Sequence, residues 1–388
     1  MTSRTASTFA SPIVESRKWL LESEQPAGRP LINVSQAAPV EPPPTAMRQE
    51  IARVALDVPE AHLYGPVFGL PALRSEVAQQ WSQSYGGQIG QANVAITAGC
   101  NQAFCGTIAA LLGEGDAVML PVPWYFNHKM ALDMAGAEAL PLPLGPDMIP
   151  DPERAEALLT DRVKAIALVS PNNPTGVEYP ADVLDAFYAL CQSRGIRLIL
   201  DETYRDFAQL GAHGLFQKDD WSGTLVQLYS FSKSYRLTGH RLGTIVADPA
   251  LLVEIEKYLD TVTICPAQIG QHAALWGMQN LAQWLSGERA EILRRGEALH
   301  RLFDETPPAG WRLVSSGAYF GYLEHDFGLT SQDLAKRLVA EAGILMLPGS
   351  FFAPEADAAA QRQMRVAFAN LNEDGIQQFG QRLSEWRP

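Results

Sequence analysis

The chain has 388 residues, with 30 basic and 43 acidic side chains, and its formal net charge of −13 argues against a nucleic-acid backbone or an anionic membrane surface as the main partner. Hydrophobic residues make up 47% of the sequence, which is typical of a globular protein and excludes disorder of the whole chain. At about 100–200 residues per domain, the length predicts two or three structural units.

No stretch of the sequence is suited to export or to crossing a membrane. The N-terminal segment lacks the continuous apolar run of a signal peptide, and the apolar stretch at residues 103–112 is far short of the ~20 residues that span a bilayer. The four cysteines form no CxxC pair and have no histidine at ligand spacing. We therefore expect buried free thiols, no metal site and a cytoplasmic location.

Residues 1–45 are rich in proline, with four prolines between positions 39 and 44. Proline lacks the N–H that helices and central strands need, so we expect this segment to run over the surface without packing as a helix or a central strand. A helix is expected to begin at Pro71, because proline in the first helical turn loses no intrahelical hydrogen bond.

Short apolar runs alternate with helical periods from about residue 93 to residue 250. The predicted strands cover residues 93–97, 117–120, 163–169, 196–200 and 224–229, and predicted helices cover 103–112 and 181–192. This alternation predicts βαβ units and therefore an α/β fold with a mostly parallel sheet covered by helices on both faces.

The pattern changes after about residue 250. It predicts long helices at 251–259 and 271–303, a strand-like stretch at 312–323, a helix at 331–341, and short strands at 344–347 and 364–368. These elements predict a second, smaller α+β unit. We therefore expect a large domain of residues 46–285 and a small domain in which the N-terminal arm, residues 1–45, joins residues 286–388.

Side chains suited to ligand binding follow four of the predicted strands. The segments are Ala98-Gly99-Cys100, the SPNNPTG stretch at 170–176, Asp201-Glu202-Thr203-Tyr204, and Ser230-Phe231-Ser232-Lys233. Each segment alone has an ordinary explanation as a turn, a helix cap or a solvated charge. Because ligands in open α/β sheets bind at the carboxyl ends of the strands, the four together predict a binding site.

These motifs resemble those of the class I/II, fold-type I aminotransferases, which depend on pyridoxal phosphate (PLP). The resemblance rests on SPNNPTG, DETYRDF at 201–207, SFSKSYRLTGHRLG at 230–243 and MRVAFAN at 364–370, and it runs from about residue 30 to the end. It implies a seven-stranded, mostly parallel sheet flanked by helices in the large domain, beside a smaller α+β domain. It also implies an enzyme that moves an amino group between an amino acid and a 2-oxo acid.

The resemblance assigns the catalytic lysine to Lys233, which would hold PLP as a Schiff base and carry the proton. That role requires an amine whose pKa is lowered. Asp201 matches the carboxylate that keeps the pyridine nitrogen protonated. Tyr204 and Asn173 match the residues that hydrogen-bond the 3-oxygen of the cofactor, whereas Asn172 is expected to serve the turn.

The resemblance also supplies a phosphate site. Gly99 and Cys100 would offer backbone N–H groups at the positive end of a helix dipole. Ser230 matches a hydroxyl ligand, and Arg241 matches a guanidinium that makes a charge-assisted contact with the phosphate. Tyr125 matches the aromatic residue that stacks on the cofactor ring, although the neighbouring Trp124 and plain core packing are alternatives.

Substrate contacts are implied at both ends of the chain. Arg365 resembles the arginine that binds the substrate α-carboxylate as a bidentate fork, with Asn173 beside it. Ala37 stands where the family often has glycine near that carboxylate. Tyr64 resembles the tyrosine that reaches the phosphate in the neighbouring subunit, which implies a homodimer with shared active sites.

Two departures from the family pattern limit the resemblance. Asn101 stands where many relatives have lysine, which removes a cation near the phosphate end, and residues 260–265 contain no arginine where dicarboxylate-specific relatives place one. A buried carboxylate without a cationic partner is costly. We therefore expect that the preferred donor has an apolar, aromatic or sulfur-containing side chain and is not aspartate.

Three functions remain open at this point. The leading one is an aminotransferase with glutamate and 2-oxoglutarate, or a similar pair, as one couple. The second is a PLP-dependent C–S β-lyase on the same scaffold, because the same carbanion expels a β-leaving group. The third is a PLP-fold module without turnover, which the presence of Lys233, Asp201, Tyr204, Arg241 and Arg365 argues against.

Overall fold

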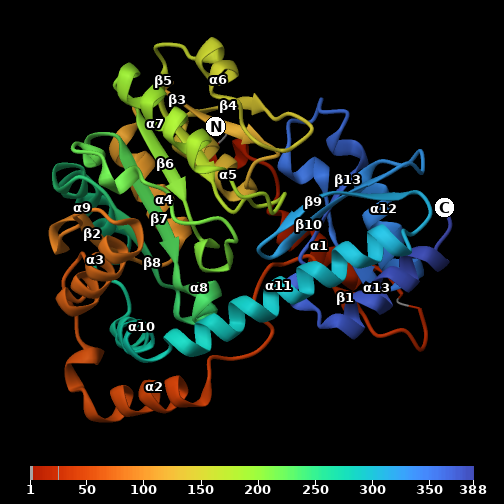
Figure 1. Cartoon of the computed structure of the whole chain (residues 1–388), viewed down its shortest axis with the longest axis horizontal. Coiled ribbons are helices and arrows are strands. Elements are labelled where there is room, and N and C mark those ends of the chain that lie inside the picture. Colours follow the sequence, from red (N-terminus) through yellow and green to blue (C-terminus); the bar gives the residue numbers. More distant parts are fainter. Residues whose placement is uncertain (1–2, 25) are drawn as a thin grey trace.

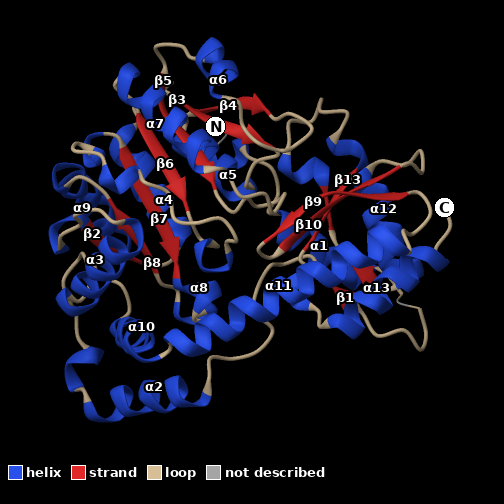
Figure 2. Cartoon of the chain, in the orientation of Figure 1, coloured by secondary structure: helices blue, strands red, loops and turns tan. Residues whose placement is uncertain are grey.

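A seven-stranded sheet forms the centre of the computed structural model, which describes residues 3–24 and 26–388 (Figures 1 and 2). The strand order is β2-β8-β7-β6-β5-β3-β4. The strands are β2 (Val94–Thr97), β3 (Ala117–Val122), β4 (Glu138–Pro143), β5 (Val163–Val169), β6 (Arg197–Asp201), β7 (Leu225–Ser230) and β8 (Gly243–Val246). All neighbouring pairs from β7 to β4 are parallel, whereas β8 is antiparallel to both β2 and β7. The predicted α/β class and mostly parallel sheet are therefore confirmed.

Helices cover both faces of this sheet (Figure 2). They are α3 (Pro71–Tyr85), α4 (Cys100–Leu111), α5 (Phe126–Ala135), α6 (Pro152–Leu158), α7 (Ala181–Arg194), α9 (Pro249–Thr263) and α10 (Gln268–Asn280). Along β6, Leu198 and Leu200 join one hydrophobic core with Trp81 of α3, while Ile199 joins the other core with Phe104 of α4. Successive side chains of a strand point to opposite faces, so an uninterrupted apolar strand needs a helix layer on each side.

Two strands of the sheet were not predicted. The strands expected from the apolar runs are all present, with boundaries that differ by no more than two residues. The edge strand β4 contains Pro141 and Pro143 and is largely half-buried or exposed, so it lacks the uniform apolar run of a central strand. The short β8 pairs antiparallel and therefore falls outside the βαβ rhythm.

A smaller antiparallel sheet stands beside the large one (Figure 1). Its order is β12-β13-β10-β9, with β9 (Trp311–Gly317), β10 (Phe320–His325), β12 (Leu347–Pro348) and β13 (Gln363–Val366). The single stretch predicted at 312–323 is thus a hairpin. Helices α12 (Ser331–Arg337) and α13 (Glu373–Glu385) pack here, and α12 continues as a π-helix through Leu338–Ala342.

The helix predicted at 271–303 is divided in two. It consists of α10 and the 24-residue α11 (Ala282–Glu305). Trp284 and Leu285 of α11 pack against the core of the large sheet, and Leu299 and Phe303 belong to the core of the small one. Figure 1 shows α11 running from one sheet to the other. Because α11 contributes side chains to both cores, it connects the two parts of the structure.

The N-terminal segment packs into the structure, contrary to the prediction that it runs over the surface. Helix α1 (Pro12–Glu22) buries Trp19 in the small core, where its ring stacks on Phe351 at 5.7 Å between centroids. Strand β1 (Ile32–Asn33) pairs in parallel with β11 (Ile344–Leu345). The prolines that suggested a surface segment cluster after these elements, and Pro12 occupies the first turn of α1, where proline is tolerated.

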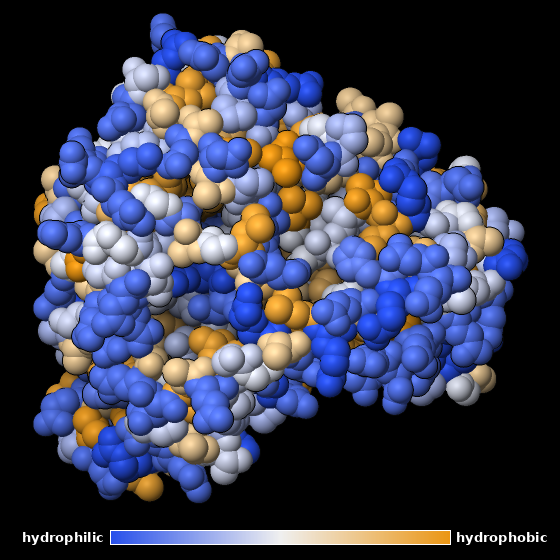
Figure 3. All heavy atoms as spheres, in the orientation of Figure 1, coloured by the Kyte–Doolittle hydropathy of each residue, from blue (hydrophilic) through white to orange (hydrophobic). Residues whose placement is uncertain are grey.

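The remaining helices are α2 (Thr45–Asp57), at the lower edge of Figure 1, and the single turn α8 (Phe231–Ser234). Across residues 3–24 and 26–388, no helix combines the length and the apolar character needed to cross a membrane. On the face drawn in Figure 3 the surface is mainly hydrophilic, and hydrophobic residues are scattered over it, several of them near the centre of the view.

Substituting Trp19 tests the packing of the N-terminal helix. Trp19 is 3% exposed, so Trp19→Ala leaves a cavity and should lower the free energy of unfolding by about 3–5 kcal/mol in urea titrations. Leu21, on the same helix, is 87% exposed, and Leu21→Ala should change stability by no more than about 0.5 kcal/mol. Equal effects of the two substitutions would contradict the packing of α1 described here.

Candidate active site

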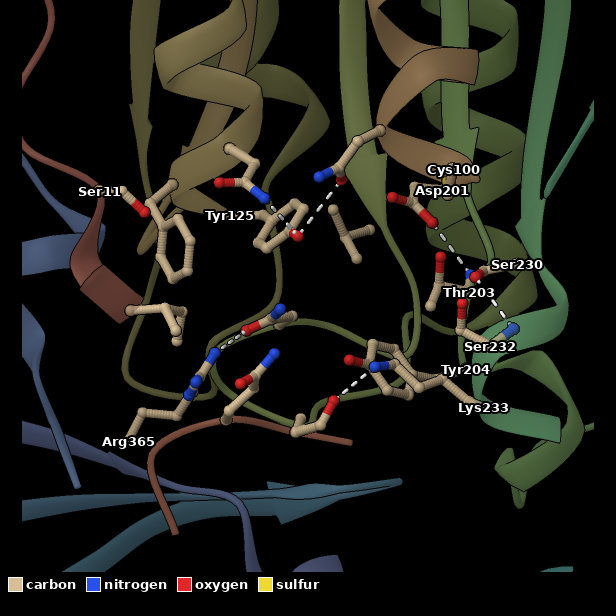
Figure 4. Close-up of a pocket in the computed structure, with 18 of the residues that line it drawn as sticks. Ser11, Cys100, Tyr125, Asp201, Thr203, Tyr204, Ser230, Ser232, Lys233 and Arg365 are labelled. Carbon is tan, nitrogen blue, oxygen red and sulfur yellow. Dashed lines mark hydrogen bonds between the residues drawn. The ribbon is translucent and has the colours of Figure 1, made fainter. Parts of the chain in front are cut away.

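A cavity of about 420 Å³ opens at the carboxyl ends of β5, β6 and β7. These ends are aligned, because Val169 pairs with Asp201 and Ser170 N–H donates to the Asp201 carbonyl at 3.0 Å. The cavity is closed on its other side by Arg365 of the small sheet and by residues of α1 (Figure 4). Side chains from distant parts of the chain therefore converge on one space.

Lys233 lies in the single turn α8, directly after β7. Ser230 caps this turn, since its hydroxyl accepts the N–H of Ser232 at 3.3 Å. The Nζ atom donates to the Ala37 carbonyl. Burial lowers the pKa of Lys233 to about 8, and the positive charges of Arg365 and Arg241 add to this effect. An amine with this pKa is available in its neutral, nucleophilic form near physiological pH.

Asp201 ends β6 and is 3% exposed. One carboxylate oxygen accepts the Thr203 N–H at 3.0 Å, and the other lies 3.3 Å from His128 Nε2. His128 comes from α5 and stacks on Phe104, with the ring centroids 3.9 Å apart. The aspartate is thus fixed in direction by one N–H donor and by the adjacent imidazole, which suits a carboxylate that must face a single protonated atom.

His128 was missed by the sequence analysis. It lies one turn after Tyr125 at the start of α5, and its ring edge meets the Tyr125 ring at 5.0 Å between centroids. Nothing in its spacing from Asp201 signals their contact, because 73 positions separate them (201 − 128). The one sequence feature that could have pointed to His128 is its position shortly after Trp124 and Tyr125, which were considered as residues of the site.

Tyr204 and Asn173 line the cavity on the side of the small sheet. Tyr204 packs between Tyr319 and Phe320, with ring centroids at 5.4 and 5.1 Å, and burial raises its pKa well above the usual value. The side-chain oxygen Oδ1 of Asn173 accepts a hydrogen bond from Arg365 Nη1 at 2.9 Å. The preceding Asn172 holds the turn, as expected, because its side chain accepts the Thr175 N–H and hydroxyl.

The loop that carries Asn173 packs closely against the small sheet. Gly176 has φ +78°, and a Cβ there would collide with the backbone of Gly317 in β9. Only glycine therefore allows this approach. The loop that carries Asn173 thus brings the end of the large sheet into contact with the small sheet beside the cavity.

Arg365, on β13, is a buried cation that lacks a carboxylate partner among the described residues. It is 2% exposed, its Nη1 and Nη2 donate to Asn173 Oδ1 and the Ser35 carbonyl, and its Nε has no partner there. Burial lowers its pKa to about 10. A buried guanidinium without an anion is costly, so the site is suited to receive a carboxylate.

The opposite end of the cavity is suited to a phosphate. Cys100 and Asn101 open α4, and the hydroxyls of Ser230 and Ser232 line the same space. Gly99 has φ +92°, and a Cβ there would lie 2.5 Å from Arg241 Nη2, so a larger residue would displace the guanidinium. A helix N-terminus, hydroxyls and a guanidinium form a donor set for a bound anion.

Of the three remaining residues predicted to serve the site, Tyr125 and Ala37 line the cavity, whereas Tyr64 does not. Tyr125 lines the cavity and accepts a hydrogen bond from Asn127 Nδ2 at 2.9 Å, whereas Trp124 does not line it. Ala37 lines the cavity beside Lys233. Tyr64 is 80% exposed and lies outside the cavity, next to Cys265.

Residues of α1 and its N-cap residue Ser11 were also missed. Ser11, Ile13, Val14 and Arg17 line the cavity. They escaped notice because the segment was expected to lie on the surface. In the described part of the chain, no cluster of three or more His, Cys, Asp or Glu side chains could hold a metal ion.

The sequence matches the family described as "Aminotransferase class I and II" over residues 29–383. The chain belongs to this family. It is therefore a PLP-dependent aminotransferase, and the donor set of the cavity fits the cofactor: an anion site at one end, a lysine with a lowered pKa, and a carboxylate fixed in direction.

Individual relatives are similar over nearly the whole chain. An aromatic aminotransferase of Arabidopsis thaliana is 26% identical, covering 98% of this chain and 94% of its own. An arginine–pyruvate transaminase of Pseudomonas aeruginosa is 29% identical, covering 76% and 75%. A solved structure of a double mutant of Thermus thermophilus aspartate aminotransferase superposes with a TM-score of 0.89 at 24% identity, covering 98% of both chains, which shows the shared fold.

The lowered pKa of Lys233 can be measured in the cofactor-free aminotransferase. After reductive ¹³C-methylation, the NMR signal that disappears in the Lys233→Arg variant should titrate with a midpoint near 8, because burial and two guanidinium groups disfavour its charged form. An unperturbed lysine side chain titrates at ~10.4, which is the reference value for this comparison. A Lys233 midpoint at that reference value would contradict the proposed electrostatics.

Proposed function

We propose that the reaction takes place in the cavity around Lys233, and that the enzyme transfers the amino group of an apolar, aromatic or sulfur-containing amino acid to a 2-oxo acid. The observation that carries the proposal is the shared cavity, in which the Lys233 amine, the Asp201 carboxylate and the Arg365 guanidinium face one space. These groups match the three tasks of the reaction: holding the cofactor, tuning it and orienting the amino acid.

PLP, when bound, supplies an electron sink that stabilises negative charge at the α-carbon of the amino acid. Asp201, fixed by His128 and by the Thr203 N–H, would hold a proton at the pyridine nitrogen. Tyr204 and Asn173 would donate hydrogen bonds to the 3-oxygen, and Tyr125 would cover the ring. Arg241, Ser230 and the N–H groups of Gly99 and Cys100 would bind the phosphate.

Lys233 would move the proton. Its Nζ atom would accept the α-proton of the amino acid and later donate it again from the same side, and a pKa of about 8 suits a base working near neutral pH. Arg365 would bind the α-carboxylate as a fork, with Asn173 beside it, and so fix which bond at the α-carbon is aligned for reaction. Since Arg365 belongs to the small sheet, its ligand would also draw the two sheets together and exclude water.

The donor preference is supported by the apolar side chains at the cavity mouth. Ile13, Val14 and Phe126 are among the residues that line the cavity. Residues 260–265 contain no arginine that could hold the short side chain of aspartate. An apolar donor would therefore lose less hydration free energy on binding than aspartate.

A screen of half-reactions tests the function. The absorbance of the lysine-bound cofactor should decrease when leucine, phenylalanine or methionine is added, and little when aspartate is added. With a 2-oxo acid present, the products should be the donor's own 2-oxo acid and a new amino acid in equal amounts. Lys233→Ala should abolish turnover. Release of ammonia, pyruvate and a thiol from S-alkylcysteine in place of amino transfer would favour the β-lyase.

We also propose that two copies form a homodimer in which Tyr64 completes the partner's phosphate site. Tyr64 and Leu63 are 80% and 67% exposed, and they lie beside Cys265. Leu56 and Ile264, next to these segments in the sequence, are 83% and 42% exposed. Exposed apolar side chains gathered in this way are typical of a surface that is buried by a partner.

Subunit mixing tests the shared site. Tyr64→Phe should weaken PLP binding, and Lys233→Ala should be inactive. In a mixture of the two variants, half of the randomly paired dimers are hybrids with one intact site of two, so activity at limiting PLP should recover to about a quarter of the wild-type value.

The control is a chain that carries both substitutions, which should give no recovery when mixed with Lys233→Ala. No recovery in the first mixture either, or a fully active monomer, would show that Tyr64 does not serve a second subunit.

The domain boundaries and the cellular location are also part of the proposal. The division into residues 46–285 and residues 1–45 with 286–388 is supported by the separate hydrophobic cores around the two sheets. The cytoplasmic location is supported by the four cysteines, all of which are free.

A further inference from the structure

We propose that Asp206 is a positioning residue for Lys233: one of its carboxylate oxygens holds both ends of the short turn that carries the lysine. This inference rests on the proposed function, because it takes Lys233 as the residue that moves the proton. It goes beyond that function in giving a task to a carboxylate that does not line the cavity.

The turn that carries Lys233 needs support from outside itself. Helix α8 has only four residues, and so short a helix is not stable through its own hydrogen bonds. Phe231 packs into a core of the large sheet, but this apolar contact does not fix the rotation of the turn, because hydrophobic contacts are not directional. The direction in which Lys233 points therefore depends on hydrogen bonds between side chains.

Asp206 provides two of these hydrogen bonds through a single oxygen atom. Its Oδ2 accepts the hydroxyl of Ser234, the residue directly after Lys233. The same atom accepts the phenol of Tyr229, the residue directly before Ser230, at 2.6 Å. Tyr229 and Ser234 are almost completely buried, so water cannot replace the lost acceptor. Because the acceptor is a carboxylate, each bond is charge-assisted and stronger than a bond between neutral groups.

The surroundings fix the direction of these bonds. Burial and the charge of Asp206 raise the pKa of the Tyr229 phenol well above its ordinary value, so the phenol stays protonated and acts as the donor. The other oxygen of Asp206 lies 4.0 Å from Nε of Arg205. The Arg205 guanidinium in turn stacks on the Trp81 ring of α3, 4.0 Å from its centroid. The carboxylate is therefore oriented by groups on both of its oxygens.

The same carboxylate also connects two side chains of the site. Asp206 lies in the short 3-10 helix Arg205–Phe207, which begins directly after Tyr204. Lys233 Nζ is 6.0 Å from the centroid of the Tyr204 ring, and the two side chains lie close together in Figure 4. A shift of the turn would change the place of Lys233 relative to Tyr204 and to the reacting carbon of the substrate. Because a misplacement of about 1 Å can lower a rate about 100-fold, Asp206 affects the reaction without touching the reacting atoms.

A titration of Lys233 in the full-length, cofactor-free protein separates positioning from a direct effect of charge. Removing a negative charge would by itself lower the Lys233 pKa. Releasing the turn would instead hydrate the amine and move it away from Arg365 and Arg241, which raises its pKa from about 8 toward the ordinary ~10.4. In the ¹³C-methyl NMR titration we expect Asp206→Ala to raise the midpoint by about 1 pH unit or more. Asp206→Asn removes the charge but keeps an oxygen acceptor, and it should leave the midpoint unchanged or slightly lower.

Single-turnover half-reactions of the holoenzyme, measured per bound cofactor, provide the second readout. Asp206→Ala should lower the rate constant at saturating donor about tenfold or more. The half-saturating donor concentration should change less than about twofold, because Arg365 and Asn173 still hold the α-carboxylate. Asp206→Asn should retain most of the rate.

Asp333→Ala is the matched control. It removes a carboxylate that accepts the Thr330 hydroxyl at 2.7 Å at the start of α12, outside the cavity. This variant should leave the Lys233 midpoint and the rate constant unchanged.

Ser234→Ala takes the place of Asp206→Ala if the latter does not fold. It removes only the donor next to Lys233 and leaves the Tyr229 bond, so both readouts should change in the same direction by a smaller amount. The inference is wrong if the variant used leaves the Lys233 midpoint unchanged or lowers it, or if its rate constant equals that of the wild type. The proposed function, by contrast, would fail if the wild-type protein transferred no amino group to a 2-oxo acid.

Discussion

The site depends on one buried cation that is held by three distant parts of the chain. Arg365 comes from the small sheet, donates to Asn173 at the end of the large sheet, and donates to Ser35 in the N-terminal segment. It lies between the rings of Phe320 and Phe352, about 5 Å from each centroid. Because a buried charge must keep its few hydrogen bonds, these three parts must come together for the cavity to exist.

The floor of the cavity is rigid for a related reason. Directly after Asp201, Glu202 turns away from the cavity into a buried cluster in which it accepts Gln227 Nε2 at 2.7 Å and the Tyr85 hydroxyl. Burial opposes its charge, yet His213, Arg205 and Tyr85 hold its pKa down to about 2. A carboxylate held in this way fixes the backbone between Asp201 and Tyr204, and therefore fixes the direction of both side chains that face the cofactor site.

The cavity lies between two separately packed parts of the structure. Lys233, Asp201 and Ser230 follow buried parallel strands, whereas Arg365 and α1 belong to the small core, which α11 connects to the large one. Preorganised charges are most effective when they do not rearrange during the reaction. The residues that line the cavity therefore come from both parts: Asp201, Ser230 and Lys233 from the large sheet, and Arg365 and residues of α1 from the small core.

The sequence by itself determined what depends on local pattern. Apolar runs of the right length predicted five of the seven strands of the large sheet, because buried strands must be apolar on both faces. Asp201, Ser230 and Lys233 each follow such a run, and the rule that ligands bind at strand ends was enough to group them in one site. The motifs around them supplied the family, the cofactor and the importance of Arg365.

Only the tertiary structure decided what depends on contacts between distant residues. Three features leave no periodic signal in the sequence: the approach of His128 to Asp201, the hydrogen bonds from three cations to residues 35–37, and the burial of Trp19. In each case the residues involved fit the local sequence pattern of their own segment, so nothing in that pattern points to the distant partner. The edge strand β4 was missed because its prolines and exposed positions hide the apolar run. The sequence analysis also misplaced α1, because the proline-rich stretch beside it masked this short helix. The burial of α1 is determined by the small core against which it packs.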